Sequence, residues 1–251
     1  MLDEGQYSAE SIAQYELIYG KDFVSPGGAD MARKLIESMQ LPAGAHVLDI
    51  GCGLGGSAFM MAKQFGLRVD AVDLSRNMIE QAQQRQREYG LQQSISFELK
   101  DCLHIDSKDR YDAVYSRDVF LHIDNKAELF TVITDALKPG AQLLFTDYTC
   151  GPKPWSLEFS AYVSERGYHL RTVDEYATLV QRAGLSLVDS SNVSDAFLDI
   201  LHGEKQSIAQ LPISAAERAS LIESRQRKIE HVIAAEHQWG LIRAVKEHAS
   251  P

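Results

Sequence analysis

The chain has 251 residues, enough for one large domain or two small ones, and 45% of them are hydrophobic. That apolar content is too high for a disordered chain, and no uninterrupted apolar run is long enough to predict a membrane span. The formal charge of −10 argues against sequence-independent binding to nucleic acid, which needs a basic face. A small anionic substrate stays possible, since a local group of Arg, Lys and Tyr can lie in an acidic protein.

The cysteines Cys52, Cys102 and Cys150 form no CxxC pair and no zinc-ligand spacing. We therefore expect neither a disulfide framework nor a structural metal. The first residues are polar and acidic and show no signal or transit peptide, so a reducing cytoplasm is the expected location.

In chain order, the first residues predict two helices. Residues 8–20 form the first, with Ser8 as its cap, and residues 31–39 form the second, beyond a break at Ser25-Pro26-Gly27-Gly28. From residue 46, short apolar runs alternate with helical periodicity. The predicted strands cover 46–50, 68–72, 95–99, 111–115, 142–146 and 185–189, and the helices between them cover 56–65, 77–89, 126–137 and 173–183. This alternation predicts a parallel sheet with right-handed crossovers, with Pro139-Gly140 ending the helix before the fifth strand.

The C-terminal part departs from this alternation. It predicts a helix at 157–166 within an insertion at 148–171, helices at 195–209 and 215–237, and a last strand at 239–245. The expected fold is therefore α/β, a Rossmann-like, seven-stranded, mostly parallel sheet with a helical lid. We expect a single domain, 1–251, made of N-terminal lid helices (1–42), a cofactor-binding core (43–150) and a substrate cap with the last strands (151–251).

The strongest motif is an apolar strand that ends in Asp49-Ile50 and continues as Gly51-Cys52-Gly53-Leu54-Gly55. Glycines let the backbone turn sharply and approach a ligand closely, and ligands of open α/β sheets lie at this edge. A dinucleotide fingerprint has the spacing GxGxxG, whereas the spacing here is GxGxG. The carboxylate of Asp49 would repel a pyrophosphate and attract a cation.

Two further strand ends carry aspartates. Asp73 follows the second strand, where a carboxylate can accept both hydroxyls of a ribose, and Asp101 follows the third, where it can accept from an adenine amino group. Over about residues 45–150 these features resemble the class I S-adenosylmethionine-dependent methyltransferases. The resemblance implies that Asp49 and the glycines lie near the methionine portion of the cofactor, Asp73 near its ribose and Asp101 near its adenine. It further implies cofactor contacts from Ile50, Gly51, Gly53, Leu74, Cys102 and Arg117.

The segment that follows the fourth strand supplies candidates for chemistry on an amine. If residues 118–123 form a helical turn, Asp118 and His122 lie four apart and share a face. A carboxylate can orient a protonated amine, and histidine is the side chain that ordinarily titrates near neutral pH. We therefore expect Asp118 and His122 to point toward the cofactor sulfur.

Several short patterns add a closer resemblance, which spans roughly residues 5–180 and a further match near the C-terminus. They are Gln6-Tyr7, Tyr15-Glu16, Phe23–Gly28, Ser116-Arg117-Asp118 with Leu121-His122, Asp147-Tyr148, Tyr162–Tyr168 and Gln238-Trp239-Gly240. These patterns resemble the phosphoethanolamine N-methyltransferases. The resemblance implies that Tyr7 and His122 form a catalytic dyad and that Asp118 holds the amine.

The same resemblance implies a lid turn and a phosphate pocket. Ser25, Gly27 and Gly28 would line the cofactor as the lid closes. Tyrosine hydroxyls, a guanidinium and an ammonium all donate to phosphate. By motif position the substrate-binding residues are Tyr15, Tyr148, Tyr162, Arg166, Tyr168 and Lys228.

The sequence thus predicts an S-adenosylmethionine-dependent N-methyltransferase of a small polar amine, foremost phosphoethanolamine and its methylated intermediates. Two departures bear on the substrate: Pro26 replaces a small polar residue and stiffens the lid turn, and residues 190–237 resemble the family weakly. The lid, Ser-Arg-Asp and Arg-Gly-Tyr patterns also resemble the methyltransferase domain of ovothiol-forming enzymes. N-methylation of the imidazole of 5-mercaptohistidine is therefore the alternative reaction.

A non-catalytic S-adenosylmethionine-binding module is a further alternative. It predicts a lost polar centre, yet Tyr7, Asp118 and His122 are all present. Residues 217–237 carry dense charge, which we interpret mostly as a solvated helix face. His231 and His237 lack partners at ligand spacing, so we predict no metal. The acidic charge and the short apolar runs predict no nucleic-acid and no membrane partner.

Overall fold

The computed structural model describes residue 4 and residues 7–248. Within them a seven-stranded sheet has the order β3-β2-β1-β4-β5-β7-β6, in which β7 is antiparallel to both of its neighbours and the other pairs are parallel. The strands are β1 (His46–Ile50), β2 (Arg68–Asp73), β3 (Ile95–Leu99), β4 (Tyr111–Arg117), β5 (Leu137–Cys150), β6 (Leu185–Asn192) and β7 (His237–Lys246). The expected α/β, Rossmann-like sheet is confirmed.

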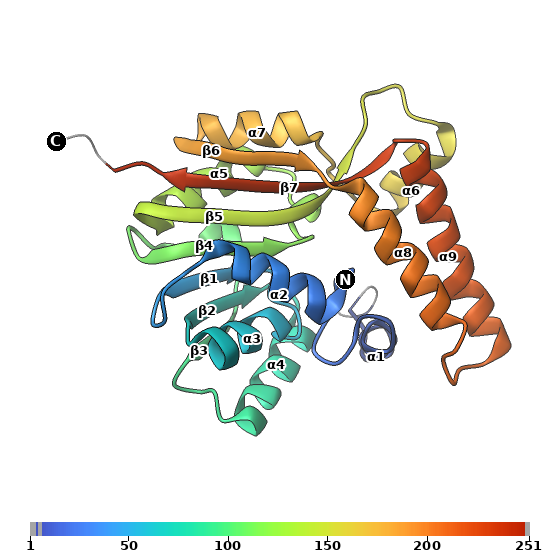
Figure 1. Ribbon diagram of the computed structural model, residues 1–251, viewed down its shortest axis with the longest axis horizontal. Coiled ribbons are helices and arrows are strands. Elements are labelled where there is room, and N and C mark those ends of the chain that lie inside the picture. The colour runs from blue at the N-terminus through green and yellow to red at the C-terminus, as the bar shows by residue number, and fades with distance from the viewer. Residues whose placement is uncertain (1–3, 5–6, 249–251) are drawn as a thin grey trace.

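Helices cover both faces of this sheet (Figure 1). The helices in the described part of the chain are α1 (Ala9–Tyr19), α2 (Gly28–Met39), α3 (Gly56–Phe65), α4 (Arg76–Tyr89), α5 (Lys126–Ala136), α6 (Leu157–Arg166), α7 (Val173–Arg182), α8 (Ser194–Ile208) and α9 (Ala215–Ile233). Short 3-10 turns occur at η2 (Cys102–His104) and η3 (Phe120–His122). Successive strand residues point to opposite faces, so Val47 packs in the cluster under α2 and α3 and Leu48 in the cluster under α5 and α7. Burial on both faces explains why the parallel strands are apolar throughout.

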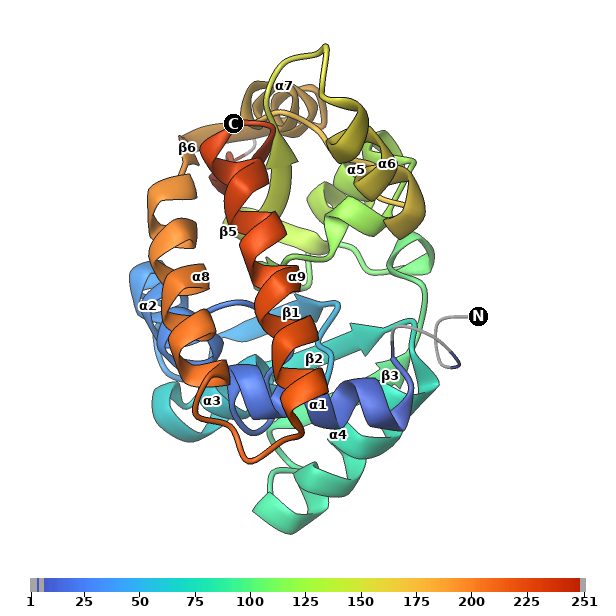
Figure 2. The same ribbon diagram turned by 90° about the vertical axis from the view of Figure 1, so that its right-hand side faces the viewer.

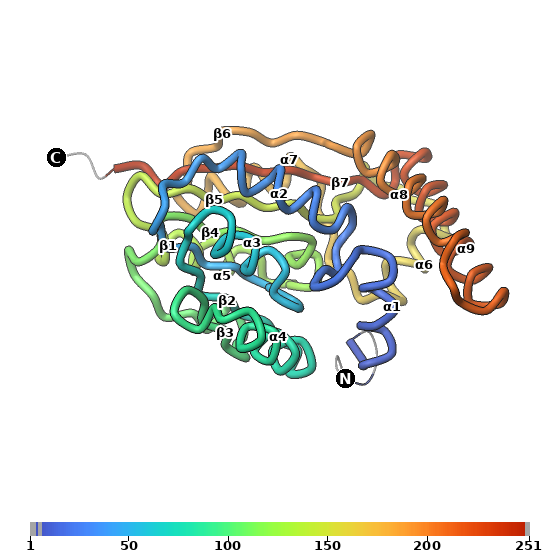
Figure 3. Tube along the Cα trace, turned by 60° about the horizontal axis from the view of Figure 1, so that its bottom comes forward, coloured from blue at the N-terminus to red at the C-terminus, as the bar shows by residue number. Residues whose placement is uncertain are grey.

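The helices α1, α6, α8 and α9 gather beyond the carboxyl ends of the parallel strands. α8 and α9 run side by side across this end, and α1 lies against them although it is nearly two hundred residues away in the chain (Figure 2, Figure 3). α9 begins with a capping box, in which the Ser214 side chain accepts from Glu217 N and the Glu217 side chain accepts from Ser214 N. The predicted Ser8 cap of α1 is confirmed, because its hydroxyl accepts from Ser11 N. This arrangement sets a helical cover over the edge where ligands of such sheets bind.

Some predicted boundaries were wrong. Pro139-Gly140 lies inside β5 and does not precede it, because the β4–β5 register jumps from Tyr111↔Leu137 to Ala113↔Gln142 and the extra residues form a bulge. The last helix ends at Ile233, before the predicted 237, because Ala235 has a left-handed φ of 56° that no helix continues. Among the described residues, none of the helices is both long and apolar enough to cross a membrane.

Candidate functional site

The glycine loop turns tightly against two neighbouring segments. Gly51 and Gly53 have positive φ angles of 72° and 54°. A Cβ on Gly51 would lie 2.2 Å from Val119 Cγ2, and one on Gly53 would lie 3.0 Å from Val24 Cγ2. Val119 follows β4 and Val24 belongs to the lid turn. Glycine at these positions therefore brings the loop, the strand end and the lid into contact.

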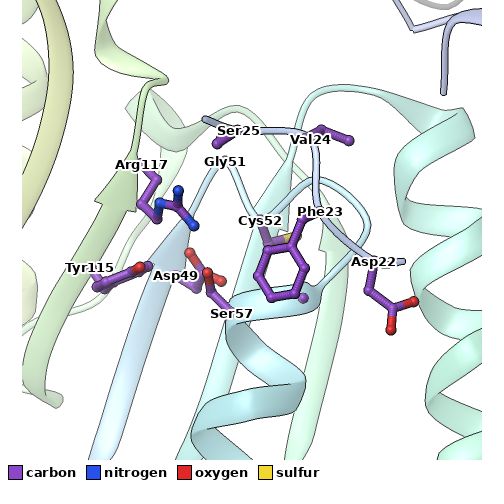
Figure 4. Close-up of a pocket in the computed structure, with 11 residues that line it drawn as sticks. Asp22, Phe23, Val24, Ser25, Asp49, Gly51, Cys52, Ser57, Tyr115 and Arg117 are labelled. Carbon is purple, nitrogen blue, oxygen red and sulfur yellow. The ribbon is translucent and has the colours of Figure 1, made fainter. Parts of the chain in front are cut away.

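Asp49 is the buried acid of a pocket between the loop and the lid. Its side chain is 2% exposed, and Oδ2 has no hydrogen-bond partner. Burial, with Asp73 nearby, raises the pKa of Asp49 to about 7, while Arg117 acts in the opposite direction. Figure 4 shows Asp49 next to Ser57 and below Arg117, with Ser25 on the lid turn above them. The pocket is lined by Asp22, Phe23, Val24, Ser25, Asp49, Gly51, Cys52, Gly56, Ser57, Tyr115 and Arg117.

The next two strand ends each carry a carboxylate. Asp73 Oδ2 accepts from Gly53 N at 2.8 Å and Oδ1 accepts from Ser75 N at 2.9 Å, so the carboxylate is held at the end of β2 beside the glycine loop. Asp101 Oδ1 accepts from Leu103 N at 2.9 Å. Leu74, 54% exposed, stands at the same edge as an apolar surface.

These residues fit S-adenosylmethionine by the chemistry of their groups. The unpartnered Asp49 oxygen suits a cationic end, Asp73 suits a diol, and Leu74 with Asp101 and Cys102 suits a flat base. The three sets stand at the ends of β1, β2 and β3 in turn. We therefore treat this edge as the candidate cofactor site.

Arg117 has a part that its sequence position did not reveal. Its guanidinium donates to Pro26 O at 2.6 Å and to Gly28 O at 3.0 Å, so it ties the lid turn to the end of β4. A Cβ on Gly28 would lie 2.1 Å from Tyr19 O, which explains glycine where α1 meets α2. The lid turn is thus held closely over the Asp49 pocket.

The predicted helical turn at 118–123 was wrong. Asp118 has a left-handed φ of 55°, its N–H bonds to Thr146 O, and η3 covers only Phe120–His122. Asp118 and His122 therefore do not share a helix face. Both nonetheless follow the carboxyl end of β4.

Asp118 presents one bonded and one unbonded oxygen. Oδ1 accepts from Trp239 Nε1 at 2.7 Å and from Thr146 Oγ1 at 3.2 Å, while Oδ2 is buried without a partner. Burial raises the pKa of this carboxyl, and the cation of Arg117 works against that rise. A buried carboxylate oxygen of this kind can bind a protonated amine.

His122 is neutral at neutral pH. Burial, followed by the charge of Lys126, lowers the pKa of its imidazole to about 4. Its ring meets that of Tyr168 edge-on, with centroids 5.4 Å apart. Lys126 was not predicted as a site residue; its Nζ donates to the carbonyls of Phe120, Ile123 and His169 at 2.9, 2.6 and 2.6 Å. It thereby fixes η3 and the segment that follows Tyr168 to each other.

Tyr7 lies beside Asn77 of α4 and Leu54 of the glycine loop. Its carbonyl accepts from Asn77 Nδ2 at 2.9 Å, and its side chain packs on the cluster that contains Leu54. Burial raises the pKa of its phenol, with Asp73, Tyr15 and Tyr168 adding to the effect. Tyr168 is thus close to both members of the predicted dyad, and the dyad itself stays a prediction.

The predicted phosphate-binding residues gather from separate segments. The Tyr168 ring lies 5.9 Å from that of Tyr162 and 6.3 Å from that of Tyr148, and the Arg166 guanidinium lies 5.8 Å from the Tyr162 ring. Lys228 Nζ donates to Tyr148 OH at 3.2 Å. Burial together with the nearby cation of Arg225 lowers the pKa of Lys228 to about 7.

Tyr15 belongs to the same surroundings. Its ring stacks on Tyr19 at 6.1 Å, and its phenol influences the pKa of both Arg166 and Tyr168. The structure therefore brings α1, α6, β5 and α9 together around one group of hydroxyl and cationic donors.

A buried ion pair behind this group was missed. Arg225 and Glu204 are 8% and 7% exposed, with Arg225 Nε 3.2 Å from Glu204 Oε2, and Arg225 also donates to Tyr19 OH at 3.2 Å. The interpretation of 217–237 as a solvated face was wrong for Arg225 and for His231, which is also buried. Arg225 lies three residues before Lys228 and so shares its helix face, a signal that could have identified it.

Within the residues that the structure describes, no group of three or more His, Cys, Asp or Glu could hold a metal ion. Cys52, Cys102 and Cys150 are buried free thiols, and burial raises the pKa of Cys102 and Cys150 to about 12. None of the three thiols is therefore a ready nucleophile.

The sequence of the chain is similar to those of known methyltransferases. Residues 47–140 match the model of a methyltransferase domain. The chain is 37% identical to phosphoethanolamine N-methyltransferase 1 of Arabidopsis thaliana over 98% of its own length, and it spans about half (51%) of that relative. It is 32% identical to phosphoethanolamine N-methyltransferase of Plasmodium falciparum, of which it covers 95%.

The fold is similar to that of a solved relative of the same name. Phosphoethanolamine N-methyltransferase 2 of Haemonchus contortus, in complex with phosphomonomethylethanolamine and S-adenosylhomocysteine, superposes with a TM-score of 0.94 at 31% identity. The match covers 98% of this chain and 59% of that one. A putative sarcosine dimethylglycine methyltransferase of Galdieria sulphuraria, at 20% identity and a TM-score of 0.77, is similar in fold alone.

Proposed function

The chain belongs to the phosphoethanolamine N-methyltransferase family, and we propose that it transfers methyl groups from S-adenosylmethionine to the nitrogen of phosphoethanolamine and of its methylated intermediates. The observation that carries the proposal is the pairing of two opposite charges in one site. Asp118 offers an unpartnered carboxylate oxygen, Lys228 lies near enough to lower the pKa of this carboxyl, and Arg166 lies near Lys228. An amine at one end and a phosphate at the other match this pair.

S-adenosylmethionine, when bound, supplies a methyl group on a cationic sulfur. Asp49 would attract the cationic end of the cofactor, Asp73 would accept the ribose hydroxyls, and Asp101 would accept from the adenine amino group. Arg117 would keep Ser25 and its neighbours over the cofactor through its bonds to the lid turn. Exclusion of water by this cover favours transfer to the substrate over hydrolysis.

The substrate nitrogen must lose a proton so that its lone pair can attack. Asp118 would hold the ammonium through Oδ2. The neutral His122 imidazole would accept the proton at a ring nitrogen, and its place after β4, edge-on to the Tyr168 ring, supports that assignment. Tyr7, from the lid, would complete the dyad and close the site.

The anionic end would lie among the hydroxyl and cationic donors. Burial raises the pKa of Tyr148, Tyr162 and Tyr168, so their hydroxyls stay protonated and donate. A phosphate dianion would meet these hydroxyls and the cations of Arg166 and Lys228, with Tyr15 covering them from α1.

The decisive assay supplies S-adenosylmethionine with a labelled methyl group and compares phosphoethanolamine with ethanolamine and with 5-mercaptohistidine. We expect label in phosphoethanolamine, and little in ethanolamine because it lacks the phosphate. Label in 5-mercaptohistidine alone would establish the alternative reaction. Cofactor binding without any product would establish the non-catalytic module.

We propose the cytoplasm as the location and no nucleic-acid, membrane or metal partner. For the organisation of the chain we propose lid helices at 1–42, a cofactor-binding core at 43–150 and a substrate cap with the last strands at 151–251. The packing of α1 on α8 supports a single domain, because the two ends of the chain build the same cover.

A further inference from the structure

Trp239 lies beneath the candidate amine site. It belongs to β7, is 1% exposed, and pairs with Tyr148 of β5 in the sheet. Its indole Nε1–H donates to Asp118 Oδ1 at 2.7 Å, which is in the range of a strong charge-assisted hydrogen bond. The proposed methyl transfer assigns no role to Trp239.

The indole bond leaves the two oxygens of Asp118 in different states. Oδ1 is also bonded to the Thr146 hydroxyl at 3.2 Å, so two donors hold it. Oδ2 is buried and has no partner. A carboxylate held through one oxygen cannot rotate freely, and its second oxygen keeps one direction.

Trp239 is itself firmly placed. Its N–H donates to Ser194 Oγ at 3.0 Å and its carbonyl accepts from Val193 N at 2.7 Å. Its ring packs on Phe197 of α8, with centroids 5.4 Å apart. The indole is therefore held both by β7 and by the first turn of α8.

We propose that Trp239 is a positioning residue for the amine: its indole N–H, together with the Thr146 hydroxyl, holds Asp118 Oδ1 so that Oδ2 faces the substrate nitrogen. This rests on the proposed function, in which Asp118 holds the amine. Charge-assisted bonds to a fixed carboxylate reduce the reorganisation needed when the ammonium binds.

A buried tryptophan needs a partner for its N–H whatever its function. Trp155 meets that need with the carbonyl of Gly151 at 2.9 Å, away from the amine site. The Trp239 indole N–H instead donates to Asp118, the carboxylate that we assign to the substrate amine. The two tryptophans of the chain thus form a natural pair for a controlled test.

The test compares Trp239→Phe with the matched control Trp155→Phe, since each change removes one indole N–H and keeps an aromatic ring. For Trp239→Phe we expect kcat/KM for phosphoethanolamine to fall roughly ten- to hundredfold, as for loss of a hydrogen bond to a charged group. The fall should lie mainly in KM, with the dissociation constant of S-adenosylmethionine unchanged. Thr146→Val should give a smaller fall of the same kind, and Trp155→Phe should change neither constant.

A spectroscopic measurement keeps the proposal testable if Trp239→Phe fails to fold. NMR of native protein records the two indole N–H resonances, and the one that is missing from the spectrum of Trp155→Phe is assigned to Trp155. Asp118→Asn should shift the Trp239 resonance and leave the Trp155 resonance in place. Addition of phosphoethanolamine to native protein, without cofactor, should likewise shift only the Trp239 resonance.

Two results would overturn the proposal: an unchanged KM in a folded Trp239→Phe variant, or a Trp239 resonance indifferent to Asp118→Asn. If native protein does not methylate phosphoethanolamine at all, the proposed function fails. The positioning role then fails with it, and the Trp239 resonance in Asp118→Asn tests only the indole–carboxylate bond: a shift supports this bond and an unchanged resonance refutes it.

Discussion

The buried pair of Arg225 and Glu204 makes a quantitative prediction about stability. Both residues are buried, so removal of one side chain leaves the other as an uncompensated buried charge. Glu204→Leu should therefore lower the free energy of unfolding by about 3–5 kcal/mol. Arg225→Met should cost about 1 kcal/mol more, because it also loses the bond to Tyr19 OH that holds α1 against α9.

The double variant separates this pairing from general packing. Glu204 Oε1 has no partner, so the pair is incompletely satisfied and an apolar replacement of both side chains should cost much less than the sum of the single changes. Urea unfolding of native protein, both single variants and the double variant gives the four free energies. Arg227→Met, at an exposed position of the same helix, is the matched control. Single changes no worse than this control, or additive single changes, would refute the reasoning.

Three further predictions concern the site. Burial raises the pKa of Asp49 to about 7, and the ionised carboxylate attracts a cation, so the affinity for S-adenosylmethionine should rise with pH up to about 7 and then level off. Calorimetry should find no such pH dependence in Asp49→Asn. A pH dependence that persists in this variant would exclude Asp49 as its source. His122→Ala should lower kcat about 10²–10⁴-fold without changing cofactor affinity. Because the pKa of this imidazole is about 4, kcat of native protein should not fall as the pH decreases through 6.5. Steady-state rates measured across this pH range would reveal such a fall. Arg166→Met should raise KM for phosphoethanolamine about tenfold or more, whereas Glu165→Gln should not, and equal effects of the two changes would remove the guanidinium from the phosphate pocket.

The sheet could be predicted because its signals are local. Apolar strands such as 46–50 alternate with amphipathic helices, and parallel pairing follows from the crossover length. The boundaries that failed depend on long-range contacts or on single backbone angles. The bulge that takes in Pro139-Gly140 depends on the pairing of Tyr111 with Leu137, and the end of α9 depends on the left-handed φ of Ala235.

The candidate cofactor site could be predicted for a similar reason. Asp49, Asp73 and Asp101 each end a strand, and a parallel sheet brings such ends to one edge. Asp118 and His122 could be named from their motif, but their relative placement could not, since it depends on the left-handed φ of Asp118 and its bond to Thr146.

Charge on α9 could not be assigned from composition. Glu223 and Arg227 are exposed on this helix, whereas Arg225 is buried and Lys228 partly buried, and only the helix phase relative to α8 and α1 separates them. Burial of Arg225 depends in turn on Glu204, which comes from a different helix. The spacing of Arg225 from Lys228 indicates a shared helix face, but the pairing with Glu204 forms between two segments, so no local pattern encodes the ion pair.

The cationic side chains of this cover repel one another, and that repulsion would give the anionic end of the proposed substrate a physical part in closure. Arg166 and Arg225 both lower the pKa of Lys228, which means that these cations repel each other, while Glu204 opposes only part of that repulsion. They come from α6 and α9, and the tyrosines beside them come from α1, β5 and the turn after α6. A dianion placed among them would relieve the repulsion and favour protonated Lys228, so it would stabilise the packing of these segments on one another. The net charge of −10 does not oppose this, because at physiological ionic strength exposed charges beyond about 8 Å are largely screened whereas these partly buried groups are not.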